Sequence, residues 1–469
     1  MNRNKLSTKL ILVFCFFLIG ILFMLYKPDN LTNVYNGYYT FILFSYFLVG
    51  GAFVFCITIK GIYIFEPITM VMPLTIITFS VEPLICIISG DTTLLGFEVF
   101  EGCYKATLIY MVASLTYLFG YFTKIRTSNE KKVVEKEVTI RNKVIVNNKK
   151  KILFLAYIFW IVGFSVQLLD FLKQGYSYDY IFSLGAAGSF EATESSLGAI
   201  TNIRFFMLAP LLYLDLYSDK KALKWTMRIL AILLTMLRTS RWIILIYILS
   251  PIVLHYVKEK KKPSKKVLIP TFILSVFLIG AMQYFRASIR DGSGLDSLGS
   301  SGFSVSYIWG AFQLNFDLFK TLYGAVVYFP GEHAFTLGKQ MIFLTIATII
   351  PRAIWPTKPI SVIEELKANF LGSGAVDGHW AYAQLTEFYI EFGITGVIVL
   401  MFGFSKLCKY LIKLCKTNND HNLIIYSIMF PMLMQLVIRG YMPNNFWSVI
   451  FLLLPIWAIN IIIRLKWKR

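Results

Sequence analysis

Arginine side chains that could bind phosphate gather at a few short stretches of the sequence. Arg238 and Arg241 enclose "TS" between two apolar runs, and Arg286 and Arg290 are four residues apart, so a helix would present them on one face. A guanidinium offers a planar fork of hydrogen-bond donors that matches phosphate oxygens. The same group includes Arg204, Arg439 and, in "PRAIWPTKP", Arg352. These arginines indicate a site for a phosphate or pyrophosphate.

One histidine has the setting of a general base. His379 lies in "GSGAVDGHWAYAQLTEFYIEFGITG", after a glycine-rich turn and before the start of an expected helix. Histidine is the side chain best suited near neutral pH to take a proton from a hydroxyl. A capping or packing role is equally compatible with the spacing alone. The sequence has no Asp-x-Asp pair and no His or carboxylate cluster with metal-ligand spacing, so we expect neither a metal nor another cofactor.

The composition determines which elements must position these residues. Of 469 residues, 57% are hydrophobic and only 15% are charged, and the mean hydropathy is +0.64. A soluble domain could not bury so much apolar surface. The pattern predicts an all-α polytopic membrane protein with about twelve transmembrane helices. The expected spans are 10–26, 38–59, 67–89, 104–122, 152–172, 200–216, 225–237, 242–257, 267–285, 385–405, 423–438 and 446–463.

The charges of the connecting segments predict the orientation. Lys and Arg concentrate in alternate connections, such as "KEKKKPSKK" before the ninth span, and these should be cytoplasmic. Both termini then lie in the cytoplasm. The net charge of +20 belongs mostly to these juxtamembrane clusters, so the pattern favours contact with membrane lipids and gives no sign of nucleic-acid binding.

A long insert divides the chain into three parts. Residues 1–285 carry the first nine expected helices, 286–384 form a large extracytoplasmic loop, and 385–469 carry the last three. The loop contains "LFKTLYGAVVYF" and "KQMIFLTIATIIP", which are too apolar for a soluble domain and too short to span reliably. We interpret them as amphipathic or re-entrant helices that form a cap on the outer face.

The arginines described above fall on this outer side. A single arginine near a helix end most often extends to the lipid headgroups. That explanation predicts a cytoplasmic bias, whereas here several arginines gather on the side that the charge rule disfavours. A polyanion held at the outer membrane surface explains the group better.

Several motifs resemble bacterial O-antigen polymerases and ligases. His379 is followed by Gln384, Leu385, Glu387 and Tyr389, and then by "EFGITG" entering a membrane helix, which is similar to the end of the large outer loop in these families. The "TSR" of residues 239–241 and "PRAIWPTKP" resemble the polymerase branch. The final glycines lie about one turn further from the histidine than in the ligase-type pattern. With the number of helices and the position of the loop, the resemblance extends over most of the chain.

The resemblance implies a GT-C-like fold and a metal-independent polymerase of oligosaccharide repeat units. Such an enzyme works at the outer face of the bacterial cytoplasmic (inner) membrane and uses a glycan donor linked to undecaprenyl pyrophosphate. It would transfer that glycan to the non-reducing end of another lipid-linked repeat unit, for O-antigen or a similar polysaccharide. It also implies a partner of the chain-length-regulator type. Pyrophosphate would be bound by Arg241 and Arg290, supported by Arg238, Arg286, Arg352 and Arg439; His379 would be the base, oriented or replaced by Glu387 or Glu391.

Other functions remain open at this point. An O-antigen ligase or a polyprenyl-phosphate-sugar glycosyltransferase would show the same outer arginines, although the latter typically uses an acidic residue in the first outer loop, where only Asp29 is available. A flippase for lipid-linked oligosaccharides would also bind pyrophosphate. It needs alternating access, usually through two similar halves, and this sequence shows no such repeat.

Overall fold

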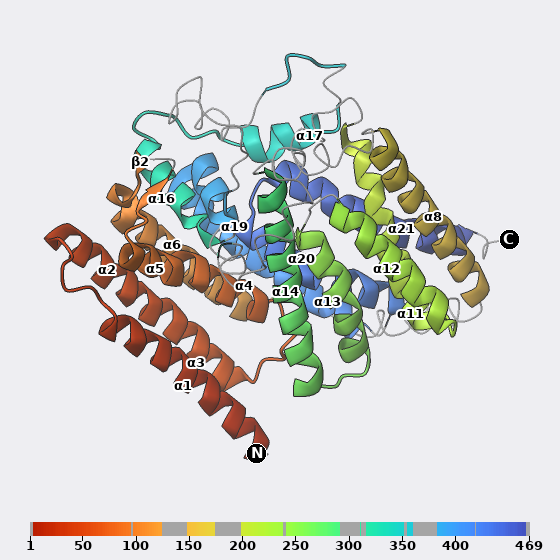
Figure 1. Cartoon of the computed structure of the whole chain (residues 1–469), viewed down its shortest axis with the longest axis horizontal. Coiled ribbons are helices and arrows are strands. Elements are labelled where there is room, and N and C mark those ends of the chain that lie inside the picture. Colours follow the sequence, from red (N-terminus) through yellow and green to blue (C-terminus); the bar gives the residue numbers. More distant parts are fainter. Residues whose placement is uncertain are drawn as a thin grey trace.

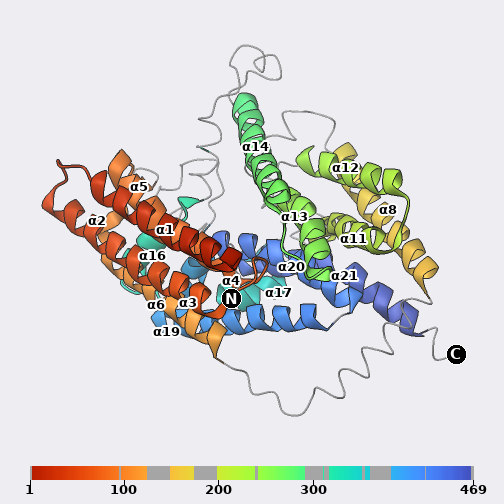
Figure 2. The same ribbon diagram turned by 90° about the horizontal axis from the view of Figure 1, so that it is seen from below.

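The computed structural model is mostly helical (Figure 1). It describes residues 3–94, 97–123, 148–173, 198–237, 241–290, 310, 316–350, 354–359, 382–417 and 419–465; at some helix ends, including 236–237, 241 and 282–290, it describes the backbone alone. The helices form two groups, which Figure 2 shows from a second direction. One contains the helices within residues 3–122 together with those at 319–328 and 384–416, and the other contains the helices at 149–173 and within 208–258, with those at 420–438 and 442–465 packed beside it.

The first group begins with the long helix α1 (Arg3–Leu25). The elements α2 (Asn33–Ser45), the π-helix η1 (Tyr46–Gly50) and α3 (Gly51–Lys60) form one continuous rod, as do α4 (Ile68–Ile76), the π-helix η2 (Ile77–Val81) and α5 (Glu82–Ser89). A short antiparallel hairpin, β1 (Thr93–Leu94) and β2 (Phe97–Glu98), and the 3-10 turn η3 (Phe100–Gly102) lead into α6 (Cys103–Phe122).

The second group contains the two short helices that the sequence predicts around the "TSR" stretch. These are α12 (Lys221–Leu237) and α13 (Arg241–Lys258), and they pack against each other. Before them come α8 (Lys149–Lys173), the 3-10 helix η4 (Gly198–Met207) and α11 (Leu208–Tyr217). After them, α14 (Lys265–Arg290) continues five residues beyond the predicted end at 285.

The C-terminal elements connect the two groups. The helix α19 (Gln384–Lys416) packs against α6 and α20 (Asp420–Ile438), and α20 packs against α13, α4 and α21 (Met442–Leu465). The insert contributes α16 (Phe319–Tyr328), the π-helix η6 (Lys339–Leu344) and the short α17 (Thr345–Ala347). In Figure 1, α17 lies at the top of the molecule and α16 at the upper left, and the N-terminus lies at the bottom.

Several helices have the length and composition of membrane spans. Among the described residues, six helices meet both criteria: Asn33–Lys60, Ile68–Ser89, Lys149–Leu169, Gln384–Lys416, Asp420–Ile438 and Met442–Arg464. Every span predicted from the sequence coincides with a helix, although the sixth begins as 3-10 helix. The protein is therefore a multi-pass membrane protein, and the crossing of the membrane by all twelve predicted helices stays a prediction.

The exposed side chains match this assignment. On α14, Phe272 is 67% exposed, and its neighbours Ile269, Ile273, Leu274 and Phe277 are also exposed. An apolar surface of this kind is stable against lipid and costly against water. At the end of α6, Lys406 and Lys409 donate hydrogen bonds to the carbonyl oxygens of Gly120 and Thr123. Cationic side chains stabilise a helix C-terminus in this way.

Candidate active site

The long helix α19 is interrupted close to its start. Phe392 and Gly393 leave the helical conformation, and Gly393 has φ 63° and ψ −155°, a region that only glycine adopts readily. A Cβ atom there would lie 2.8 Å from the ring of Phe335. The break frees two carbonyl oxygens, and those of Ile390 and Glu391 accept hydrogen bonds from the backbone N–H groups of Thr336 and Leu337 at 3.1 and 2.9 Å.

The side chain of Glu391 strengthens the same contact. It is fully buried, and its two carboxylate oxygens accept the backbone N–H groups of Gly338 at 2.5 Å and Met341 at 2.6 Å. These groups belong to the first turn of η6, where a helix has unpaired donors and favours negative charge. Glu391 therefore fastens the insert to α19.

Glu387, one turn earlier, makes a second contact of this kind. Its buried carboxylate accepts the backbone N–H of Met442 at 2.7 Å, at the start of α21. Nearby, the Gly440 N–H donates to the Tyr382 carbonyl at 2.6 Å. A Cβ atom on Gly440 would lie 2.9 Å from the Ala383 carbonyl oxygen, so the close approach requires glycine. Together these contacts place the α20–α21 connection against the start of α19.

Arg439 lies in that connection, next to Gly440. The Asn445 side chain donates to the carbonyl oxygen of Arg439 at 2.7 Å and holds the backbone in place. Burial lowers the pKa of the Arg439 guanidinium below its ordinary value. The structure therefore brings Arg439, Glu387 and Glu391 to one end of α19, close to residue 382, where the described chain resumes after His379.

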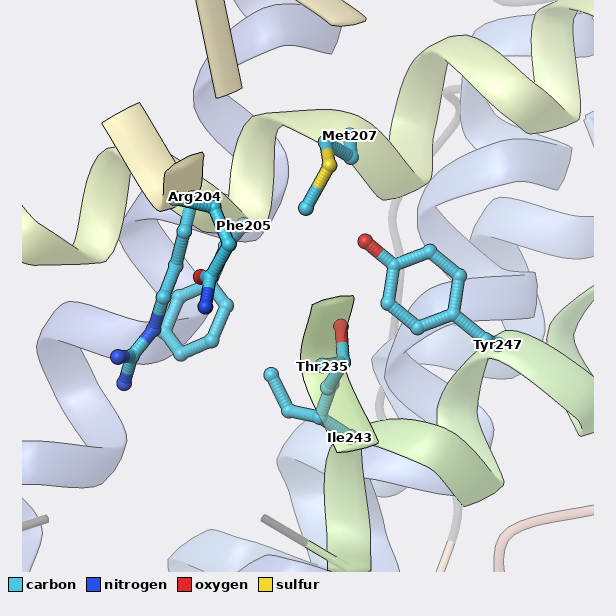
Figure 3. Close-up of a pocket in the computed structure, with 7 residues that line it drawn as sticks. Arg204, Phe205, Met207, Thr235, Ile243 and Tyr247 are labelled. Atoms are coloured by element: carbon cyan, nitrogen blue, oxygen red, sulfur yellow. The ribbon is translucent and has the colours of Figure 1, made fainter. Parts of the chain in front are cut away.

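A small cavity lies beside the predicted arginine bend (Figure 3). Thr235, near the end of α12, and Ile243, near the start of α13, line it from the two sides of the 238–240 connection. The hydroxyl groups of Thr235 and Tyr247 point towards the space between the labelled side chains, and Arg204 from η4 lies along one side. The remaining lining residues are Gln167, Phe205 and Met207.

Arg204 is unusual among the charged residues of the described chain. Its Nη1 atom is buried and has no hydrogen-bond partner among the described residues, and its guanidinium carbon lies 5.0 Å from the centre of the Phe205 ring. Buried polar atoms are normally hydrogen-bonded, and a buried charge is normally paired.

The other predicted arginines lie at helix ends. Arg241 is the first residue of α13, and Arg290 is the last residue of α14, with Arg286 one turn before it, so the two do share a helix. Their side chains lie outside the described part of the chain, as do residues Arg238, Arg352 and His379 as a whole. Their roles stay predictions from the sequence.

The fold also creates an ionic cluster that the sequence spacing did not indicate. Lys320, at the start of α16, is almost completely buried and lies 2.9 Å from an oxygen of Asp91 and 3.0 Å from an oxygen of Asp317. Cys86 approaches Asp317 at 3.9 Å, so one sulfur and two carboxylates come close enough to hold a metal ion. Burial raises the pKa of the Asp317 carboxyl, and Lys320 opposes this effect. Because its ammonium already contacts both carboxylates, we interpret the cluster as an ion pair.

Comparison with known proteins identifies the family. No curated protein and no solved structure matches this chain. A sequence model of the family described as O-antigen polysaccharide polymerase Wzy matches residues 7–466, which is nearly the whole chain. The resemblance to the O-antigen polymerase family is thereby confirmed, and neither the ligase nor the flippase alternative is favoured. The chain belongs to the Wzy family of O-antigen polymerases, membrane proteins of polysaccharide biosynthesis.

Proposed function

We propose that this protein joins oligosaccharide repeat units that are carried on undecaprenyl pyrophosphate, at the outer face of the bacterial cytoplasmic membrane. The observation that carries the proposal is the family match over residues 7–466, since members of this family work on lipid-linked repeat units in membranes. The growing glycan would leave its pyrophosphate carrier and be transferred to the non-reducing end of another lipid-linked unit. A chain-length-regulator partner stays a prediction of the family resemblance.

The leaving group determines what the site must supply. When the glycosidic bond to pyrophosphate breaks, negative charge develops on the departing oxygen, and fixed cations near that oxygen lower the barrier. We assign this role to Arg241 and Arg290, supported by Arg238, Arg286, Arg352 and Arg439. The proposal is supported by the backbone positions of Arg241 and Arg290 at helix ends and by the position of Arg439 beside the start of α19. Guanidinium groups can neutralise the leaving group without a divalent cation.

The acceptor hydroxyl must lose its proton as the new bond forms. We assign that step to His379, whose imidazole is suited to accept a proton near neutral pH. Glu387 and Glu391 would act as positioning residues, because their carboxylates accept backbone N–H groups of other segments. They hold the insert and the α20–α21 connection against α19, close to residue 382, which follows the segment that carries His379.

Product length tests the proposed function. Purified protein in nanodiscs should convert a synthetic repeat unit on undecaprenyl pyrophosphate into a ladder of longer lipid-linked glycans, and the ladder should persist in EDTA. A ladder that needs added divalent cations would contradict the metal-independent reaction and direct attention to Cys86, Asp91 and Asp317. Folded protein that makes no ladder with or without metal would contradict the proposed function itself.

A further inference from the structure

Four lysine side chains come together where α3 and α6 end beside the last turns of α19. Lys406 and Lys409 on α19 donate hydrogen bonds to carbonyl oxygens at the end of α6, at 2.8 and 2.6 Å. The ammonium group of Lys60, the last residue of α3, lies 4.2 Å from the centre of the Phe122 ring. Lys413 lies one turn after Lys409, whose ammonium group is repelled by the other three. These four lysines are called the lysine cluster below.

The surrounding structure neutralises only part of the charge of the lysine cluster. Two helices, α3 and α6, end at the cluster, and each C-terminus contributes about half a negative charge. The carboxylate of Glu66, which accepts the Tyr121 hydroxyl near the end of α6 at 3.0 Å, contributes one more. Against the four ammonium groups, these contributions leave an excess of about two positive charges. Capping of α6 therefore explains only part of the arrangement.

Neither the described chain nor the sequence that follows α6 supplies the missing negative charge. The ion pairs of the described residues involve other cations, namely Arg228, Lys258, Lys261 and Lys320. The sequence directly after Thr123, residues 124–147, contains seven basic and three acidic residues, so it adds positive charge. Binding of an external anion would relieve the repulsion within the lysine cluster.

Exposed apolar side chains border the lysine cluster on all three helices. Ile59 precedes Lys60 on α3, Leu407 follows Lys406 on α19, and Phe119 lies one turn before the end of α6; all three are exposed. A ligand that fits both the lysines and these side chains must carry negative charge at one end and hydrocarbon at the other. An anionic phospholipid has this structure, whereas free phosphate lacks the hydrocarbon.

The position of the lysine cluster agrees with this ligand. The helix α19 packs beside α6 (Figure 2) and contacts the insert through Glu391 near its own start, so the cluster lies towards the opposite end of α19. The positive-inside rule predicts that this end faces the cytoplasm. Anionic headgroups in the cytoplasmic leaflet attract basic residues close to the membrane surface.

We propose that the lysine cluster binds the headgroup of an anionic phospholipid, whose acyl chains lie against Ile59, Phe119 and Leu407. By neutralising the excess charge, the bound lipid stabilises the junction of α3, α6 and α19. This site is distinct from the proposed reaction site, because it lies towards the other end of α19 from Glu387 and Glu391.

Thermal unfolding and lipid affinity test this proposal on the purified full-length protein. Melting temperatures are measured in phosphatidylcholine nanodiscs with and without phosphatidylglycerol, and the affinity for phosphatidylglycerol is measured by native mass spectrometry in detergent. The test variant combines Lys60→Gln with Lys413→Gln, which leaves the hydrogen bonds of Lys406 and Lys409 in place. The matched control combines Lys262→Gln with Lys266→Gln, which removes the same charge from exposed positions on the surface expected to be cytoplasmic.

Phosphatidylglycerol should raise the melting temperature of the wild type by about 2 °C or more, because a ligand that binds the folded protein stabilises it. The test variant should bind phosphatidylglycerol about tenfold or more weakly and lose most of this stabilisation. In phosphatidylcholine alone it should melt no earlier than the wild type, because it relieves repulsion between like charges. The control variant should keep the affinity and the stabilisation of the wild type.

Equal affinities in the test and control variants would overturn the proposal, since they would show only a diffuse attraction to a basic surface. Sodium pyrophosphate added to phosphatidylcholine nanodiscs separates a lipid from a free phosphate. If it stabilised the wild type as much as phosphatidylglycerol does, the lipid assignment would be wrong. If the test variant does not fold, Lys413→Gln alone decides, because Lys413 is exposed: a loss of affinity of about threefold or more is expected, and an unchanged affinity would overturn the proposal.

Discussion

Glu391 illustrates how local contacts define the role of a charged residue. Both of its carboxylate oxygens accept backbone N–H groups at the start of η6, and the side chain is inaccessible to solvent. A general base needs a free lone pair directed at the acceptor hydroxyl. In the arrangement seen here, both carboxylate oxygens of Glu391 face backbone N–H groups and are shielded from solvent, so this side chain holds the insert.

Substitution of Glu391 tests this role. Glu391→Gln removes one acceptor, since an amide NH₂ group cannot accept from the second backbone N–H, and a buried unpaired donor costs about 1–3 kcal/mol. We expect a lower melting temperature and slower chain growth, with an unchanged pH profile. Growth rates across pH and thermal unfolding in nanodiscs measure both effects. Complete loss of chain growth at an unchanged melting temperature would instead assign the proton transfer to Glu391.

At the scale of single elements, the break in α19 determines how the insert attaches. The non-helical backbone of Gly393 interrupts the helix and frees the carbonyl groups of Ile390 and Glu391. These carbonyl groups and the Glu391 carboxylate then accept hydrogen bonds from backbone N–H groups of residues 336–341. The Trp447 indole on α21 adds a hydrogen bond to the Thr345 carbonyl at 2.7 Å. The insert is therefore fixed to two membrane helices, and this defines the base of the cap that precedes the segment with Arg352 and His379.

Two glycines on the same helix provide a matched test. Gly393→Ala places a side chain in a backbone region that disfavours it and close to the Phe335 ring, so we expect a loss of about 2 kcal/mol of stability. Gly403→Ala should be neutral or slightly stabilising, because nothing lies within 4 Å of its Cβ position. Thermal unfolding of both variants measures the difference. Equal melting temperatures would show that the break does not require glycine.

The sequence predicted the helices around the arginine bend but not the contacts that attach the insert. The pair of short helices around the arginine bend was evident from two apolar runs with Arg238 and Arg241 between them, and the structure has α12 and α13 there. The contact of Glu391 with Gly338 and Met341 could not be predicted, because it joins segments far apart in the sequence through backbone groups that carry no side-chain signal. The pairing of Lys320 with Asp91 is a similar case, although a lysine inside the apolar "LFKTLYGAVVYF" was a signal that a buried partner must exist.

The two ends of the whole molecule differ in charge and in the elements they carry. The insert elements and the N-terminus lie at opposite ends in Figure 1, and the lysine-rich 258–266 connection lies at the same end as the N-terminus. The positive-inside rule assigns that end to the cytoplasm. We therefore expect the predicted arginine site and the base of the cap to share the outer face.

Labelling of introduced cysteines tests the orientation. In a background without the native cysteines, Thr93→Cys in the outer hairpin should react with a membrane-impermeant maleimide in spheroplasts. Lys262→Cys, at a position that is also exposed in the structure, should react only after the membrane is opened. The reverse pattern would place the arginine site in the cytoplasm and contradict a reaction at the outer face.

The most direct measurement is the length of the product made by three purified proteins in nanodiscs: the wild type, Arg241→Ala and His379→Ala, all with the synthetic undecaprenyl-pyrophosphate repeat unit. We expect a ladder from the wild type, and a loss of chain growth of at least about a hundredfold in each variant at equal folding, since each removes charge stabilisation or proton transfer from the transition state. A ladder that survives both substitutions would contradict the account and place the reaction at another site in the molecule.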